Sequence, residues 1–325
     1  MAENEWGSLK SLVERYKETA AKEAAFCKRR TGFANLDGEN EFKADGQKQI
    51  FVPGIYVIGA PSSLGKTTFC LQLLTQLADR GEQCLYLSYE MGELNLFRKL
   101  IARDLFERKL NGKEVTLVSA ADIRRAGTTN ADINTSLDSL ADASTMRIKY
   151  VGDWDSSTLI KKLYDFAKSI NVAPVVCIDY LQLVPAPSSR ENMTAKEKVD
   201  KLLSDLRKFQ NDTSSTLILI SSLNRASKQD NGITLSSFKE SGSIEYTADV
   251  IWALEPAIEG DETFAEAERR EREKTCRAMQ LRCLKSREDS LYKVFFQYHA
   301  NRDCFVPCAE DKIFDEPDTK RRHVR

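Results

Sequence analysis

Residues 59–68 read GAPSSLGKTT and nearly match the phosphate-loop pattern G-x-x-x-x-G-K-[ST]. Ala60 occupies the first position of that pattern, and the nearest glycine, Gly59, lies one residue too early. The stretch follows IYVIGA, an apolar run of strand length, and it precedes a helical pattern at 66–80. This context favours a phosphate loop over the alternative, a glycine-containing turn with an incidental lysine.

The loop supplies the groups that a bound nucleotide needs. Its backbone N–H groups and the helix N-terminus would face the phosphates, Lys66 would place a positive charge at the β and γ oxygens, and the Thr67 hydroxyl would bind Mg²⁺. The residues predicted to bind the nucleotide are Ala60, Ser63, Gly65, Lys66, Thr67 and Thr68.

Short apolar runs alternate with helical patterns from residue 50 onward. The runs are IFVPGIYVIGA, QCLYLSYE, RIKYVGD, PVVCIDY, TLILISSL and DVIWAL, and helical patterns lie at about 66–80, 93–109, 120–143 and 156–170. This alternation predicts an α/β fold, with a mostly parallel twisted sheet and helices on both faces. Two later runs, AMQLRCLK and LYKVFFQYH, are separated by the polar SREDS and predict an antiparallel C-terminal hairpin at the sheet edge.

Two acidic residues follow predicted strands. Asp179 follows the apolar run PVVCI, and an apolar run that ends in an acid is costly unless the acid meets water, a metal or a partner. We expect it to complete the Mg²⁺ site with Thr67; the alternative is an aspartate that caps a turn. Glu90 ends QCLYLSYE at the same carboxyl edge of the sheet, where it could orient or deprotonate the attacking water.

Seven segments together resemble the RecA-like motor domain of DnaB-type replicative helicases, which also carries alanine at the position of Ala60. They are TGFANLD (31–37), GAPSSLGKTT, LSYEM (87–91), IDYLQLV (178–184), SSLNR (221–225), ESGSIEYTAD (240–249) and KSR (285–287), in the family's order and approximate spacing. The resemblance implies a RecA-like P-loop NTPase core. It also implies an ATP-dependent helicase or translocase that uses Mg²⁺, acts on single-stranded DNA in replication and forms a homo-hexamer, with a primase or a loader as a further partner.

The resemblance also assigns catalytic roles. It gives Lys66 to the phosphates, Thr67 and Asp179 to the metal, and Glu90 to the role of catalytic base. The residues matching Lys285 and Arg287 reach across a subunit boundary to the γ-phosphate of the neighbour's nucleotide, the second as an arginine finger. A guanidinium suits that role because it neutralises charge on the transferred phosphoryl group. From spacing alone, KSRED would be interpreted as a polar turn.

A second set of residues is expected at single-stranded DNA. In the family, the segment matching SSFKESGSIE lies on a loop that faces the central pore and holds DNA phosphates. The predicted DNA-binding residues are Arg225, Lys239, Glu240 and Gly242. The alternative for this segment is the N-terminal cap of a short helix.

The chain departs from the family in three ways. The family usually has glutamine, thought to sense the γ-phosphate, where this chain has Ser222, and a basic loop residue where it has Pro61. We also expect the helical N-terminal domain to be missing, which leaves an amphipathic linker-type helix in 1–30, a motor domain in 31–305 and a flexible tail in 306–325. The missing domain and Ser222 favour the alternative function, a RecA-like recombination, accessory or loader ATPase of a phage or mobile element without unwinding activity. An inactive nucleotide-dependent scaffold is a third possibility.

Composition limits the remaining classes. The 48 basic and 49 acidic residues nearly cancel, so binding to an anionic polymer requires a local basic patch. No stretch approaches the roughly 18 apolar residues that a membrane span needs, and we expect a cytoplasmic protein that does not bind membranes. Scattered cysteines without a C-x-x-C pair favour reduced thiols over a zinc site near His299, Cys304 and Cys308.

Overall fold

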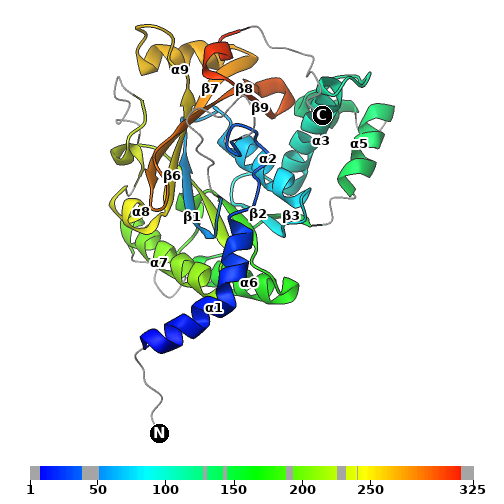
Figure 1. Cartoon of the computed structure of the whole chain (residues 1–325). Helices are drawn as coiled ribbons and strands as arrows, with labels where there is room; N and C mark the ends of the chain where they lie inside the picture. The colour runs from blue at the N-terminus through cyan, green and yellow to red at the C-terminus, as the bar shows by residue number, and fades with distance from the viewer. Residues whose placement is uncertain are drawn as a thin grey trace.

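The computed structural model describes residues 8–38, 51–126, 130–141, 145–187, 193–224, 232–239 and 241–315. Within these residues a nine-stranded sheet has the order β3-β2-β4-β5-β1-β6-β7-β8-β9 (Figure 1). The strands are β1 (Gly54–Gly59), β2 (Cys84–Ser88), β3 (Met146–Tyr150), β4 (Val175–Asp179), β5 (Thr216–Ser221), β6 (Val250–Pro256), β7 (Cys276–Ser286), β8 (Lys293–His299) and β9 (Cys304–Cys308). Every apolar run that predicted a strand forms one.

The strands from β3 to β6 in sheet order are parallel, which confirms the predicted α/β fold. β1, β2, β4 and β5 are buried along their whole length, as expected for strands with helices on both faces. The register places Gly59 of β1 beside Ser221 of β5, and Ser88 of β2 beside Asp179 of β4. The carboxyl ends of these four strands therefore meet at one edge of the sheet.

The prediction for the C-terminal hairpin was right about its strands and wrong about its position. β7 and β8 pair antiparallel, but β9 pairs with β8 and forms the edge instead. Asp303, with φ of 49°, lies between β8 and β9 where the chain reverses. The sequence CFVPC is short and contains Pro307, which an edge strand tolerates because it leaves one side of the strand unpaired.

Helices cover both faces of the sheet (Figure 1). One face carries α2 (Lys66–Ala78) and α3 (Glu93–Leu110), with α4 (Ala120–Ala126) and α5 (Ala131–Ala141) attached to α3. The other face carries α6 (Ser156–Ile170), α7 (Ala195–Thr213) and α8 (Ser241–Thr247). The helical pattern at 120–143 corresponds to α4 and α5; residues 127–129 and 142–143 lie outside the described residues.

The sequence analysis did not predict α7, although it packs across the sheet. Its apolar stripe is narrow, and charged residues fill the rest of AKEKVDKLLSDLRKFQNDT. A start signal was present, because Thr194 and Glu197 form a capping box in which each side chain accepts a hydrogen bond from the other's backbone N–H.

The predicted N-terminal helix is present as α1 (Leu9–Phe26), which begins after the N-cap Ser8. None of its residues is buried, and it projects from the rest of the molecule (Figure 1). Its apolar stripe is open to solvent, with exposed fractions of 45% for Leu12 and 65% for Tyr16. The stripe therefore has no partner among the described residues of this chain.

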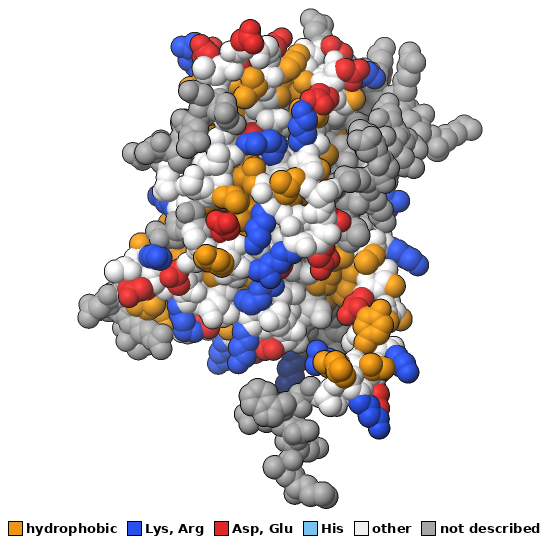
Figure 2. Space-filling view, turned by 60° about the vertical axis from the view of Figure 1, so that its left-hand side comes forward, with side chains coloured by type: hydrophobic (Ala, Val, Ile, Leu, Met, Phe, Trp, Pro, Cys, Tyr) orange, Lys and Arg blue, Asp and Glu red, His pale blue; other side chains and the backbone are white. Residues whose placement is uncertain are grey.

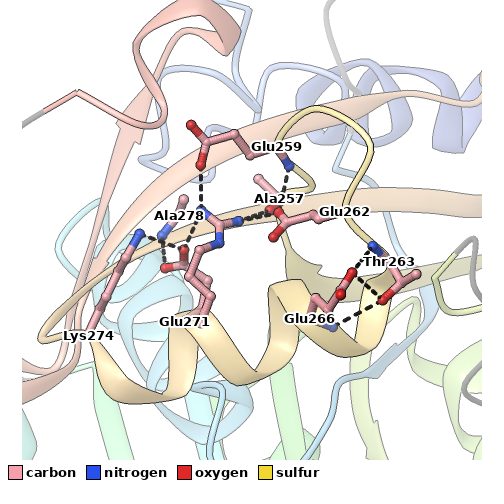
Figure 3. Close-up of polar contacts among 9 residues, drawn as sticks. Ala257, Glu259, Glu262, Thr263, Glu266, Glu271, Lys274 and Ala278 are labelled. Atoms are coloured by element: carbon pink, nitrogen blue, oxygen red, sulfur yellow. Dashed lines mark hydrogen bonds and ion pairs between the residues drawn. The ribbon is translucent and has the colours of Figure 1, made fainter.

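The polar segment 255–275, expected to be a solvated helix or flexible insertion, contains a partly buried helix, α9 (Phe264–Glu273). Glu271 is fully buried, and its carboxylate accepts hydrogen bonds from the Ala278 N–H (2.7 Å) and from Lys274 Nζ (3.0 Å) (Figure 3). Arg270 adds ion pairs to Glu262 and Glu271. The sequence suggested that these charged residues are exposed to solvent. In the structure, Glu271 instead joins α9 to β7 through its hydrogen bond from the Ala278 N–H.

Part of the C-terminal segment that was expected to be a flexible tail, 306–325, packs against the sheet. Residues 306–308 belong to β9, and Ile313 is buried beside Ala278 and Phe295. Residues 316–325 lie outside the described residues. No helix in the described part of the chain is long and apolar enough to cross a membrane.

Candidate functional site

The phosphate loop connects β1 to α2 at the carboxyl edge of the sheet. Gly65, the N-cap of α2, has φ of 94°, and an added Cβ would lie 2.8 Å from the rings of Phe305 and Tyr298. Glycine is therefore required there. Ala60 is not among the described residues with positive φ, and its small side chain is buried. The first loop position thus requires a small residue without requiring glycine.

Lys66 is the first residue of α2, and its side chain lies along the loop. Its Nζ donates to the carbonyl oxygens of Ala60 (2.8 Å) and Pro61 (3.2 Å). Burial lowers the pKa of Lys66, while the nearby carboxylates of Asp179 and Glu90 act in the opposite direction. A partly buried ammonium group held by two neutral carbonyls is suited to exchange them for an anion.

Thr68, predicted to contact the nucleotide, has its hydroxyl directed elsewhere. The Thr68 Oγ1 donates to Oδ1 of Asp303 (3.1 Å), which also forms a 2.5 Å ion pair with Lys99. Only the backbone N–H of Thr68 remains for a phosphate, together with the other free N–H groups of the first helical turn. Ser63 lies at the loop apex in the left-handed region, with φ of 65°.

Asp179 lies beside the loop at the end of β4 and is almost completely buried. Its Oδ2 accepts hydrogen bonds from Thr67 Oγ1 (2.8 Å) and from the Tyr86 hydroxyl (2.7 Å). Burial raises the pKa of the Asp179 carboxyl, and these two bonds together with Lys66 oppose the rise. A hydroxyl and a carboxylate brought together in this way form a hard-oxygen site that fits Mg²⁺.

Tyr86 was missed by the sequence analysis, because an aromatic residue inside QCLYLSYE is equally typical of the interior of any strand. Glu90, on the same segment, lies two residues beyond β2 and is exposed. The Met91 N–H donates to Ser88 Oγ (2.8 Å), which fixes the turn that carries Glu90. The carboxylate is thus at the same sheet edge as Asp179, in contact with solvent.

Lys285 and Arg287 lie at the opposite end of the strands from the phosphate loop, near the amino end of β6. Lys285 Nζ donates to the carbonyl oxygens of Glu245 and Ala248, the latter at 2.8 Å. The Arg287 guanidinium donates to the Tyr246 carbonyl (2.6 Å), and its backbone N–H donates to the carbonyl of Asp249. Because Asp249 precedes β6 and bonds to Ile55 at the start of β1, these cations lie near the amino end of the strand whose carboxyl end leads into the phosphate loop.

Figure 2 shows lysine and arginine side chains running down the middle of one face of the molecule, with carboxylates among them. Burial and the neighbouring Arg287 lower the pKa of Lys285. Two cations that lie close together, bound mainly to backbone carbonyls, can accept an anionic group from outside the chain.

The predicted DNA residues are only partly described. Arg225 and Glu240 lie outside the described residues, whereas Lys239 and Gly242 are exposed. Lys239 borders a groove of about 340 Å³ that Lys198 of α7 also lines. The short helix considered as the alternative for this segment is present as α8, which begins at Ser241. Among the described residues no cluster of three metal-ligating side chains is found, and Cys276 Sγ lies 3.8 Å from His299 Nε2.

Comparison with known proteins identifies one family and several replicative helicases that this chain resembles. Residues 30–306 match the family described as DnaB-like helicase C terminal domain. The replicative DNA helicase DnaB of Mycoplasma genitalium is 28% identical over 253 residues, which cover 73% of this chain and 50% of that protein. The replicative DNA helicase DnaC of Bacillus subtilis is 25% identical over 226 residues, which cover 68% of this chain and 45% of that protein. The chain thus spans about half the length of these relatives.

Solved structures support the fold. One solved structure, described as an ATPase domain, superposes with a TM-score of 0.72 at 21% identity, and the match covers 94% of this chain and 100% of that one. A second solved structure is described as a DnaB-like replicative helicase and its interactions with primase. It superposes with a TM-score of 0.69 at 20% identity, and the match covers 95% of this chain and 69% of that one. These similarities confirm the predicted RecA-like architecture with its antiparallel C-terminal strands.

Proposed function

Because the chain belongs to the DnaB-like helicase C-terminal domain family, we propose that it is an ATP-driven helicase motor that acts on single-stranded DNA in replication. The observation that carries this proposal is the convergence of Lys66, Thr67 and Asp179 at the phosphate loop. Two separate segments supply an ammonium, a hydroxyl and a carboxylate at the carboxyl edge of a parallel sheet, where nucleotides bind in such folds.

Each side chain has a role that follows from its position. Lys66 leaves the loop carbonyls and neutralises phosphate charge, while Thr67 and Asp179 hold Mg²⁺. When bound, the ion neutralises charge that develops on the phosphate oxygens. Tyr86 keeps the Asp179 carboxylate oriented toward Thr67. Glu90, exposed at the same edge, orients and deprotonates the attacking water.

The position of Lys285 and Arg287 supports catalysis between subunits. Within one chain these residues lie near the amino ends of the strands and the phosphate loop lies at the carboxyl end, so one chain holds only half of the site. In a ring of copies, the surface of one copy that carries Lys285 and Arg287 would meet the phosphate loop of the next, and Arg287 would act as the arginine finger. We expect a homo-hexamer, as the family resemblance implies.

The exposed apolar stripe of α1 supports assembly as well. A helix without buried residues is not stabilised by its own domain, so a second copy that covers the stripe would stabilise it. We propose that α1 docks on the neighbouring copy. The solved DnaB-like helicase was studied with primase, and a primase or a loader is the further partner we expect for this chain.

Mixing two inactive variants tests the function and the shared site together. The Lys66→Ala chain lacks a working phosphate loop and the Arg287→Ala chain lacks the finger, so neither should hydrolyse ATP at an appreciable rate in the presence of single-stranded DNA. Mixed rings contain some interfaces with an intact loop from one chain and an intact finger from the other. We expect DNA-stimulated hydrolysis to return on mixing. A mixture no more active than its separate components, although mixed assemblies form, would contradict a site shared between subunits.

A further inference from the structure

The amide of Gln182 bridges two strand ends at the nucleotide edge. Gln182 lies in the short 3-10 helix η2 (Leu181–Leu183), which follows Asp179 after one intervening residue. Its Nε2 donates to Ser221 Oγ (2.9 Å), and its Oε1 accepts from the backbone N–H of Ser222 (3.0 Å). Both polar ends of one side chain thus hold the end of β5 to the segment that carries Asp179.

The segment that starts at Ser222 pairs with the segment that ends at the predicted DNA residue Lys239. The Ser222 carbonyl accepts a hydrogen bond from the Lys239 N–H (3.2 Å), and Leu223 forms a β-bridge with Phe238. Residues 222–224 and 237–239 therefore form a short paired strip. A shift of the Ser222 backbone would move Lys239 with it.

This strip also packs against the start of the phosphate loop. Gly59 pairs with Ser221, and a Cβ added at Gly59 would lie 2.5 Å from the ring of Phe238 and 2.8 Å from Leu223. Backbone and ring are in such close contact that a movement of the loop must displace the strip. Gln182 links the same strip to the segment that carries Asp179. A movement of either the phosphate loop or the Asp179 segment would therefore shift Lys239.

The side chain at position 222 cannot provide this link itself. The Ser222 hydroxyl is buried and has no hydrogen-bond partner among the residues that the structure describes. It is also too short to take the place of the glutamine that the resembling family usually has there. The two polar ends of Gln182 satisfy the groups around it instead.

We propose that Gln182 is a positioning residue that couples the state of the nucleotide to the affinity for single-stranded DNA. This inference rests on the proposed function. Its consequence is thermodynamic: nucleotide and DNA change each other's affinity by the same factor, and Gln182 carries part of that coupling.

The test measures the dissociation constant for a labelled oligo-dT strand in the presence of ADP and of a non-hydrolysable ATP analogue. The ratio of the two constants is the coupling factor, for which about 5 to 150 is typical. Gln182→Met keeps the side-chain volume and removes both hydrogen bonds, and we expect it to lower the ratio toward 1 with DNA-free ATPase activity unchanged. Gln280→Ala is the matched control, because that amide is similarly half-buried and donates to Glu255 on β6.

A rescue variant separates a coupling role from a merely structural one. In the Gln182→Met chain, Ser222→Gln should restore much of the ratio, since it returns an amide to the same strand end. An unchanged ratio in Gln182→Met would overturn the inference. A rescue that fails would assign the loss to a general disturbance of the strand end, which also overturns it. If the unmodified chain neither hydrolyses ATP nor binds oligo-dT, the proposed function itself fails.

Discussion

The Thr67 hydroxyl donates a 2.8 Å hydrogen bond to Oδ2 of Asp179, although 112 residues separate the two in sequence. The bond joins the first turn of α2 to the end of β4 and places the two proposed Mg²⁺ ligands together before any ion binds. The Tyr86 hydroxyl holds the same oxygen from the neighbouring strand. The site is thus preorganised, and its hydroxyl can be tested separately from its carboxylate.

Replacing Thr67 by valine should abolish most of the Mg²⁺-dependent part of nucleotide binding. Valine has the shape of threonine without the hydroxyl, so the expected loss of Mg²⁺ affinity is at least about 10- to 100-fold, the effect typical even of outer-shell partners. Thr67→Ser keeps the hydroxyl and should stay close to the unmodified chain. Calorimetric titration of the nucleotide with and without Mg²⁺ measures the difference. Equal Mg²⁺ dependence in the valine and serine variants would contradict the assignment.

The sequence located these residues because they lie in contiguous motifs at strand ends, and the structure brings Thr67 and Asp179 together. Lys66 and Thr67 stand in one loop, and Asp179 is recognisable as an acid that ends an apolar strand. Tyr86 could not be found in this way, because its role depends on the pairing of β2 with β4, which local pattern does not encode.

The same reasoning explains the errors in the fold. β9 is too short to show periodicity, and its buried residues are Cys304 and Phe305, the second of which packs against Gly65 of the phosphate loop. The charges of α9 suggested a solvated segment, since the burial of Glu271 depends on the Ala278 N–H of β7. In both cases tertiary contacts decide what the local sequence leaves open.

Arg287→Ala should separate binding from turnover. The finger acts on the neighbour's nucleotide, so nucleotide affinity should change little while the hydrolysis rate falls by about 10³-fold or more. Arg147→Ala is a suitable control, because Arg147 is an exposed arginine on β3 that donates to Gln83. Steady-state hydrolysis and nucleotide titration on the same preparations give both quantities. Normal hydrolysis by the Arg287 variant would rule out the finger.

Lys239→Ala should weaken DNA binding equally for all sequences, because a lysine that contacts phosphate does not read bases. Loss of one phosphate contact on single-stranded DNA should flatten the plot of log affinity against log salt by about 0.7. Fluorescence anisotropy with labelled oligonucleotides at several salt concentrations measures the slope. Lys162→Ala, an exposed lysine on α6, should leave it unchanged. If both variants keep the original slope, the contact lies elsewhere.

Charging the stripe of α1 should reduce the size of the assembly. Leu12 and Tyr16 are exposed in the single chain, so the double change Leu12→Glu and Tyr16→Glu costs little in the folding of one copy. It would place two carboxylates in the proposed apolar contact between copies, which is unfavourable. Light scattering after gel filtration should show a smaller mass than for the control Lys17→Glu. An unchanged mass would mean that α1 does not contribute to assembly.

His299 predicts a pH dependence of stability. Burial lowers the pKa of His299 to about 4, with Arg302 acting in the same direction, while the unfolded side chain titrates near 6.5. The neutral ring packs on Phe106 and lies 3.8 Å from Cys276 Sγ. Below about pH 6.5 the unfolded chain binds a proton at His299 that the folded chain does not bind. This difference contributes to the free energy of unfolding at neutral pH, and the contribution is lost as the pH falls toward 4.

The size of this loss follows from the two pKa values. It approaches about 3 kcal/mol between pH 7 and pH 4, added to whatever the carboxylates contribute. His299→Gln removes the titration but not the carboxylates, so the stability difference between the two chains should shrink or reverse on acidification. Urea unfolding at pH 7 and pH 4.5, at one protein concentration, measures that difference. A difference independent of pH would show that His299 accepts a proton as readily in the folded chain as in the unfolded one.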